Sequence, residues 1–264
     1  MSESTDFYMS WLGCNAFGIG GGTQLNIPQP VIVFKPTDLS DCSIWLDATD
    51  NLTITADGSG NVSSWFNKGD LSGSMVPDGV YAVPTTGIHT LNGNNMIWFD
   101  SNQTLTSIFQ FSQQAYTMFL VGNVLSDLTV NNYASFFLGI GFYDFGQNIF
   151  WDSGAAEYWN GISANGIGGT IITTTSTDPI NTPSIYAYRT SSDLSSNQIL
   201  VNGVTQSLYI NDFLTYTTSA TNYWIHYPTH TSVFDVGEII IYNRALSDSE
   251  VSQVQTYLAD KFGI

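Results

Sequence analysis

The closing stretch of the chain, "GEIIIYNRALSDSEVSQVQTYLADKFGI" (residues 237–264), decides the fold class because it joins one strand to one helix. The apolar, β-branched run at residues 239–242 favours a buried strand. Ser247, followed three residues later by Glu250, predicts a capping box at the start of a helix. Gly263 suits the left-handed residue that ends a helix. We therefore expect a strand that leads directly into a terminal helix.

The predicted helix has one apolar face, because Val251, Val254 and Leu258 recur at helical spacing. Leu246 and Val251 are spaced for a hydrophobic staple, and Lys261 suits the negative end of the helix dipole. A helix of about three turns is too short to be stable alone in water. We expect it to dock on the strand just before it, where a docked helix is one way to shield the unpaired backbone groups of a sheet edge.

The rest of the sequence predicts an all-β domain. From residue 38 onward, short apolar or alternating runs are separated by turn signals such as "DGSGN" at 57–61. Asn202-Gly203 between two β-forming runs predicts a two-residue hairpin. This pattern is typical of a β-sandwich or a barrel. We expect residues 38–264 to form one domain and residues 1–37, which contain "GIGGG" and three prolines, to form an extended arm that makes assembly contacts.

Four segments together resemble laminin-G-like domains of the concanavalin A-like lectin and glucanase superfamily. The opening segment at 39–70 contains "WLDA" and, after a turn, "VSSWF"; the others are 91–105, 199–204 and 237–264. The resemblance covers about residues 38–264. It implies a jelly roll of two antiparallel sheets, in which a short C-terminal helix covers an end or an edge of the sandwich.

Composition and charge exclude several classes of function. Charged residues make up 10% of the chain, and the formal net charge is −17 with five Lys and Arg residues. Such a chain repels a phosphate backbone and an anionic membrane, so we expect no nucleic acid partner and no membrane insertion. The first 22 residues lack the basic and long apolar regions of a signal peptide. Cys14 and Cys42 are the two cysteines, and the sequence leaves open whether they pair.

The superfamily includes glucanases, so the resemblance also implies a possible catalytic carboxyl pair. A retaining glycosidase needs two carboxyl groups about 5 Å apart. The chain has four glutamates, and no two of them share a strand at alternate spacing. The sequence also lacks a nucleophile elbow, a Walker loop and a dinucleotide fingerprint. We therefore expect no enzymatic activity and no organic cofactor.

Calcium remains possible as a ligand, since many members of the superfamily bind it. The segment "FYDFGQNIFWD" (142–152) offers Asp144, Asn148 and Asp152 as oxygen ligands within a short span. The "DGSGN" segment resembles the start of an EF-hand loop, but Lys68 stands where the loop needs a glutamate. We interpret that second segment as a β-turn.

Two aromatic clusters are candidates for sugar binding, because aromatic rings stack on the apolar faces of sugars and amides bind their hydroxyl groups. They occur in "WDSGAAEYWNG" (151–161) and "TNYWIHYPTH" (221–230). The competing interpretation places these aromatic residues in the core or in a subunit contact. The candidate residues are Trp151, Tyr158, Trp159, Asn160, Tyr223 and Trp224.

Three functional hypotheses follow. The first is a non-catalytic structural protein of a virus or phage particle, in contact with other particle proteins or copies of itself, and exposed to host glycans. The alternative is a soluble carbohydrate-binding protein or adhesin located outside the cell. The third is a divergent glycoside hydrolase, which would need two opposed carboxyl groups in a cleft.

Overall fold

The computed structural model describes residues 33–100, 102–111, 115–126, 135–140, 147–152, 161–166, 169–173, 181–190, 197–211, 221–225 and 233–264. The chain separates into two compact units, Met1–Val33 and Phe34–Ile264. Residues 1–32 lie outside the described part, so the assembly role of the arm stays a prediction. All the described helices and strands belong to the second unit.

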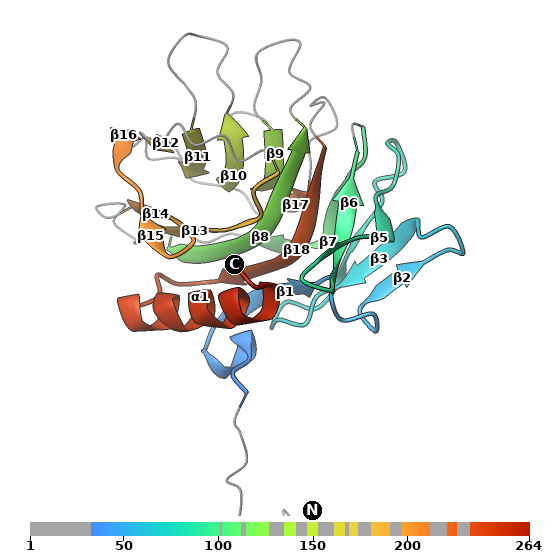
Figure 1. Cartoon of the computed structure of the whole chain (residues 1–264), viewed down its shortest axis with the longest axis horizontal. Coiled ribbons are helices and arrows are strands. Elements are labelled where there is room, and N and C mark those ends of the chain that lie inside the picture. The colour runs from blue at the N-terminus through green and yellow to red at the C-terminus, as the bar shows by residue number, and fades with distance from the viewer. Residues whose placement is uncertain are drawn as a thin grey trace, which may run out of the picture. The chain divides into compact units, whose positions relative to one another are not determined.

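The second unit is a sandwich of two antiparallel sheets with one C-terminal helix, which confirms the predicted fold class (Figure 1). The eight-stranded sheet has the order β15-β14-β13-β8-β18-β6-β5, and β1 also pairs with β18. Its strands are β1 (Cys42–Asp47), β5 (Thr85–Leu91), β6 (Asn94–Phe99), β8 (Tyr116–Ser126), β13 (Ser184–Thr190), β14 (Asn197–Val201), β15 (Val204–Thr205) and β18 (Val233–Tyr242).

The ten-stranded sheet has the order β16-β12-β11-β10-β9-β17-β7-β4-β3-β2. Its strands are β2 (Ile54–Ala56), β3 (Val62–Phe66), β4 (Ser74–Val76), β7 (Leu105–Phe111), β9 (Ser135–Ile140), β10 (Gln147–Asp152), β11 (Gly161–Gly166), β12 (Gly169–Thr173), β16 (Leu208–Asn211) and β17 (Thr221–Ile225). A short 3-10 helix, η1 (Pro36–Asp38), precedes β1. The η1 residue Pro36 is buried and its carbonyl accepts a hydrogen bond from the Tyr242 hydroxyl at 2.9 Å.

The main core lies between the two sheets. Strand β1 contributes Ile44 and Leu46 to it, and β3 contributes Trp65 from the opposite sheet. Trp45, between Ile44 and Leu46, belongs to a second apolar cluster on the outer face of the eight-stranded sheet. The central strands of this sheet are therefore buried on both faces, which explains the unbroken apolar run in β18.

Helix α1 (Asp248–Phe262) covers the outer face of the eight-stranded sheet, where its side chains join the second cluster. Figure 1 shows α1 lying along β18 and β8. The expectation that the helix shields an edge is therefore wrong. Because β18 lies between β8 and β6 and also pairs with β1, it leaves no edge to cover. It leaves an apolar outer face instead, which includes Ile240 and Tyr242.

The predicted ends of the helix are confirmed. The Ser247 hydroxyl accepts a hydrogen bond from the Glu250 backbone, and the Glu250 carboxylate accepts one from the Ser247 backbone at 2.8 Å. Leu246 and Val251, the predicted staple, are both buried. Gly263 ends the helix in the left-handed conformation with φ of 70°. Local sequence signals thus fix the start and the end of α1.

Both predicted turns are also confirmed. Asn202 and Gly203 join β14 to β15 with φ of 49° and 78°, as a two-residue hairpin of this type requires. The Asp57 carboxylate accepts hydrogen bonds from the backbone of Ser59 and Asn61, which closes the "DGSGN" turn. The side chain that an EF-hand loop would offer to calcium is therefore engaged in the turn itself.

Candidate functional site

The outer face of β3, β4, β7 and β17, which we call the open face, carries an aromatic and apolar surface. Trp65, Met75, Leu105 and Ile225 point into the core. Because side chains alternate along a strand, their neighbours point away from the core. These neighbours are Phe66, Ser74, Val76, Thr106, Ile108 and Trp224.

Strand register brings these outward residues together in two rows. Val76 is paired with Thr106, and Thr106 with Trp224, which makes one row across three strands. In the second row Phe66 is paired with Ser74, and the register of β4 and β7 places Ile108 next to Ser74.

The side chains of the second row are unusually exposed for apolar groups. Phe66 is 51% exposed and Ile108 is 65% exposed, whereas Trp224 is half-buried. An aromatic ring beside hydroxyl groups is the arrangement that binds the apolar face and the hydroxyl groups of a sugar. The open face is therefore a candidate for binding a saccharide.

Only part of the predicted sugar cluster lies within the described residues. Trp224 lies on the open face, and Tyr223 precedes it on β17. Trp151 lies on β10, where it is paired with Ser135 of β9. Trp224 is paired with Gly139, about 13 Å further along β9, so the strands do not bring the two tryptophans together. Tyr158, Trp159 and Asn160 lie outside the described residues, and sugar binding by this cluster stays a prediction.

Sequence reasoning missed Phe66 and Ile108. The signal for Phe66 was present, because it follows Trp65 in "VSSWF" and adjacent strand residues point to opposite faces. Ile108 lies in "LTSIFQF", where apolar residues on both faces obscure the alternation.

The predicted calcium ligands are described only in part. Asn148 and Asp152 are four positions apart on β10, about 13 Å along the strand, so β10 does not bring them together. Asp144 lies outside the described residues, and the calcium site stays a prediction. Within the described residues, no three His, Cys, Asp or Glu side chains form a group that could hold a metal ion. Cys42 is a buried free thiol, and burial raises its pKa to about 12.

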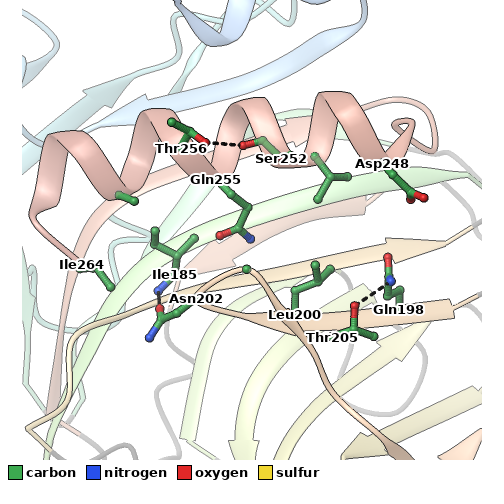
Figure 2. Close-up of a pocket in the computed structure, with 13 residues that line it drawn as sticks. Ile185, Gln198, Leu200, Asn202, Thr205, Asp248, Ser252, Gln255, Thr256 and Ile264 are labelled. Atoms are coloured by element: carbon green, nitrogen blue, oxygen red, sulfur yellow. Dashed lines mark hydrogen bonds between the residues drawn. The ribbon is translucent and has the colours of Figure 1, made fainter.

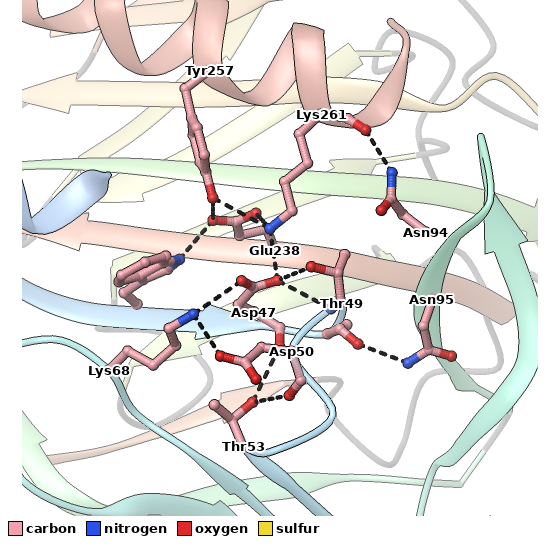
Figure 3. A network of polar contacts seen from close by, with 12 residues as sticks. Asp47, Thr49, Asp50, Thr53, Lys68, Asn94, Asn95, Glu238, Tyr257 and Lys261 are labelled. Carbon is pink, nitrogen blue, oxygen red and sulfur yellow. Dashed lines mark hydrogen bonds and ion pairs between the residues drawn. The ribbon is translucent and has the colours of Figure 1, made fainter. Parts of the chain in front are cut away.

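A pair of carboxyl groups does exist, beneath helix α1 (Figure 3). Asp47 of β1 is directly opposite Glu238 of β18. The Lys261 ammonium group lies 2.7 Å from Asp47 and 2.6 Å from Glu238. The indole of Trp45 and the hydroxyl of Tyr257 both donate to Glu238, at 2.6 and 2.9 Å. We call these five residues the buried ion network.

A β-bulge makes this network possible. The register of β18 shifts between Val236 and Glu238, so Glu238 faces the helix rather than the core between the sheets. Gly237 occupies the bulge, and a Cβ atom there would lie 2.8 Å from both Met96 and the Phe262 ring. A larger residue at this position would force the buried side chains of Met96 and Phe262 to shift, which favours glycine where the strand, β6 and the helix approach one another.

The two carboxyl groups of the network differ in their proton affinity. Burial raises the pKa of Glu238 to about 7, although Lys261 acts in the opposite direction. Burial also acts to raise the pKa of Asp47, but Lys261, Thr49 and Lys68 outweigh it and lower that pKa. Glu238 is 0% exposed and Asp47 is 4% exposed. A polysaccharide has no access to this pair, so it does not form the catalytic site of a glycosidase.

Comparison with known proteins gives matches among solved structures. No protein-family model and no curated protein matches the chain. The receptor-binding domain of botulinum neurotoxin type G is similar at a TM-score of 0.57 and 13% identity, over 82% of this chain and 51% of that domain. The binding domain of Paraclostridial Mosquitocidal Protein 1 is similar at a TM-score of 0.58 and 13% identity, over 84% of this chain and 52% of that domain. Trypanosoma rangeli sialidase is similar at a TM-score of 0.53 and 13% identity, over 84% of this chain and 33% of the sialidase chain.

These likenesses support the sandwich of two antiparallel sheets and extend over most of the chain. At this level of identity they establish the fold alone. The chain spans about half the length of the two matched binding domains and a third of the sialidase. In the described part of the chain, the one α-helix is neither long nor apolar enough to cross a membrane.

Proposed function

We propose that this chain is a non-catalytic carbohydrate-binding domain of the laminin-G-like type, which acts outside the cell as a lectin or adhesin. The observation that carries the proposal is the open face, where Phe66 and Ile108 remain exposed. Trp224 and two hydroxyl-bearing residues, Ser74 and Thr106, lie on the same face. Proteins with the same fold support it, since two of them are receptor-binding or binding domains.

The proposal favours binding over catalysis because the carboxyl pair of the buried ion network, Asp47 and Glu238, is closed to a substrate. The carboxyl pair that register brings together is sealed beneath α1 and is held by Lys261. A glycosidase needs such a pair in an open cleft, with space for the sugar and a water molecule.

The particle role predicted first from the sequence has no support in the fold or in the matches. The alternative, a carbohydrate-binding protein without a particle role, is better supported because the matched domains include binding domains. Contacts with particle proteins are therefore not included in the proposal.

The test is a glycan array with the whole chain. We expect at least one glycan to bind, and Phe66→Ser and Ile108→Ser each to weaken that signal about tenfold by removing apolar contact with the sugar. Trp224→Ala should weaken it as well. Because Trp224 is half-buried, the two exposed positions are the cleaner test.

The matched control is Ile88→Ser on β5 of the other sheet, where Ile88 is 53% exposed. This variant should bind as the wild type does. A chain that binds no glycan, or equal losses for Ile88→Ser and Ile108→Ser, would contradict the proposal. Release of reducing sugar from a bound polysaccharide would show an enzyme instead.

A further inference from the structure

A pocket lies between helix α1 and the end of the eight-stranded sheet formed by β13, β14 and β15 (Figure 2). Its volume is about 460 Å³, within the range of small-molecule sites. It is formed by the outward side chains of β13 and β14, the hairpin at Asn202, and one side of the helix. It lies on the eight-stranded sheet, whereas the open face belongs to the ten-stranded sheet.

The pocket has an apolar floor, provided by residues that include Ile185, Leu200 and Ala259. Several of its polar side chains already have partners within the protein. The Gln198 amide donates to Thr205 at 3.0 Å and accepts from Arg189 at 2.8 Å. The side-chain oxygen of Asn202, Oδ1, accepts a hydrogen bond from the Ile185 backbone N–H at 2.7 Å. These groups hold the hairpin in place and leave little capacity for a ligand.

Gln255 differs from these residues. Its side chain is 7% exposed, and its Nε2 has no hydrogen-bond partner among the described residues. Figure 2 shows its amide directed from the helix toward β13 and β14, between Asn202 and Leu200. A buried donor without a partner destabilises the free protein, and a ligand with an acceptor oxygen would remove that cost.

Charge limits the kind of acceptor. No Lys, Arg or His side chain is among the described residues that line the pocket, and Asp248 lies at its rim. The nearby Arg189 is already paired with Asp248 at 2.6 Å and donates to the Leu246 carbonyl. With a net charge of −17 as well, the chain disfavours carboxylate and phosphate ligands. A neutral carbonyl oxygen fits better.

The geometry points to a second sugar site in this pocket, one that takes the acetamido group of an N-acetylated sugar. The carbonyl oxygen of that group accepts a hydrogen bond from Gln255 Nε2, and its methyl group packs against Ile185 and Leu200. The inference rests on the proposed function for the choice of a sugar, but it uses different residues from the open face.

The experiment is an NMR titration of the whole chain with N-acetylglucosamine and, in parallel, with glucose. We expect N-acetylglucosamine to bind at least tenfold more tightly than glucose. Gln255→Leu, which keeps a similar volume but has no donor, should weaken N-acetylglucosamine about tenfold. The matched control is Gln253→Leu, an exposed glutamine on the same helix, which should leave binding unchanged.

Stability measurements keep the test interpretable. Gln255→Leu should be at least as resistant to urea as the wild type when no sugar is present, because it removes a buried unpaired amide. Loss of binding in a stable variant then reports the contact rather than unfolding. Equal affinity for glucose, or wild-type affinity in Gln255→Leu, would overturn the inference.

The same titration separates this inference from the proposed function. Phe66→Ser should leave N-acetylglucosamine binding intact, because Phe66 lies on the other sheet. If Phe66→Ser abolishes this binding and Gln255→Leu does not, the sugar binds on the open face. That result would support the proposed function and overturn the pocket as a site.

Discussion

The outer faces of the two sheets have opposite characters. On the eight-stranded sheet, α1 buries Phe119, Ile240 and their neighbours and encloses the buried ion network. On the ten-stranded sheet, Phe66 and Ile108 remain exposed among the described residues of the open face. Apolar side chains lie on both outer faces, but within the described residues a helix covers the outer face of the eight-stranded sheet alone.

The difference indicates that one outer face of the sandwich contributes to stability and the other is suited to binding. Covering one face with a helix gives the central strands a second core, which stabilises the fold. Leaving the other face uncovered keeps apolar surface in water, which stabilises nothing in the free protein but suits a binding surface. Substitutions on the two faces should therefore separate stability from binding.

The largest effect should come from Lys261→Ala. It removes the cation that lies between Asp47 and Glu238. Asp47 keeps its ion pair with Lys68 at 3.2 Å, whereas the buried Glu238 loses the ion pair that it makes with the helix. At pH 8 we expect a loss of about 3–5 kcal/mol in the free energy of unfolding, measured by urea denaturation. Lys35→Ala, at an exposed position, is the control and should change little. Similar losses in both variants would show that the network does not anchor the helix.

Leu258→Ala tests the apolar contact between the helix and the sheet. Leu258 is fully buried, and its truncation leaves a cavity that should cost about 3 kcal/mol. Ile108→Ala on the open face should change the free energy of unfolding by less than about 0.5 kcal/mol. A large loss for Ile108→Ala would mean that the open face is covered in solution, and the contrast between the two faces would fail.

Glu238 makes the stability of the covered face depend on pH. Its pKa is about 7 in the folded state, above the ordinary value of 4.5, because it is buried. Between these values the folded state keeps a proton that the unfolded chain has lost, so stability should fall as pH rises from about 4.5 to about 7. Glu238→Gln should remove this fall, and Lys261→Ala should cost less at pH 5 than at pH 8. If the urea midpoints of the wild type and of Glu238→Gln change in parallel across this pH range, Glu238 is not the group that makes stability depend on pH.

The smallest effect concerns the start of the helix. Ser247→Ala removes the cap and should lower the free energy of unfolding by about 1 kcal/mol. Ser252→Ala, at an exposed position inside the same helix, should be neutral or slightly stabilising because alanine favours helices. Thermal unfolding of both variants is sufficient to compare their stabilities. If Ser252→Ala were less stable than Ser247→Ala, the cap would contribute little.

The sequence predicted the features that depend on neighbouring residues. The capping box at Ser247, the left-handed Gly263 and the Asn202-Gly203 turn were all identified from short motifs. The all-β fold followed from the repeated short strands and turn signals. Each of these properties is set within a few residues of chain.

Features that depend on distant pairing were not predicted. The helix covers a face rather than an edge because β18 occupies the centre of its sheet, and no local motif carries that information. Lys261 lies in the last turn of the helix, where the helix dipole favours a cation, but its contact with Asp47, which is 214 residues away in the chain, was not predicted. The roles of Phe66 and Gln255 likewise depend on which strands and helix surround them.

The pairing of β1 with β18 has a consequence for how the chain folds. Trp45 and Glu238, which are hydrogen-bonded across these strands, are separated by 193 positions in sequence. The centre of the eight-stranded sheet therefore cannot assemble until segments from both ends of the domain have met, and closing such a long loop is entropically costly. Two-state domains dominated by distant contacts take milliseconds to seconds to fold, and we expect this chain to acquire its structure no faster than they do.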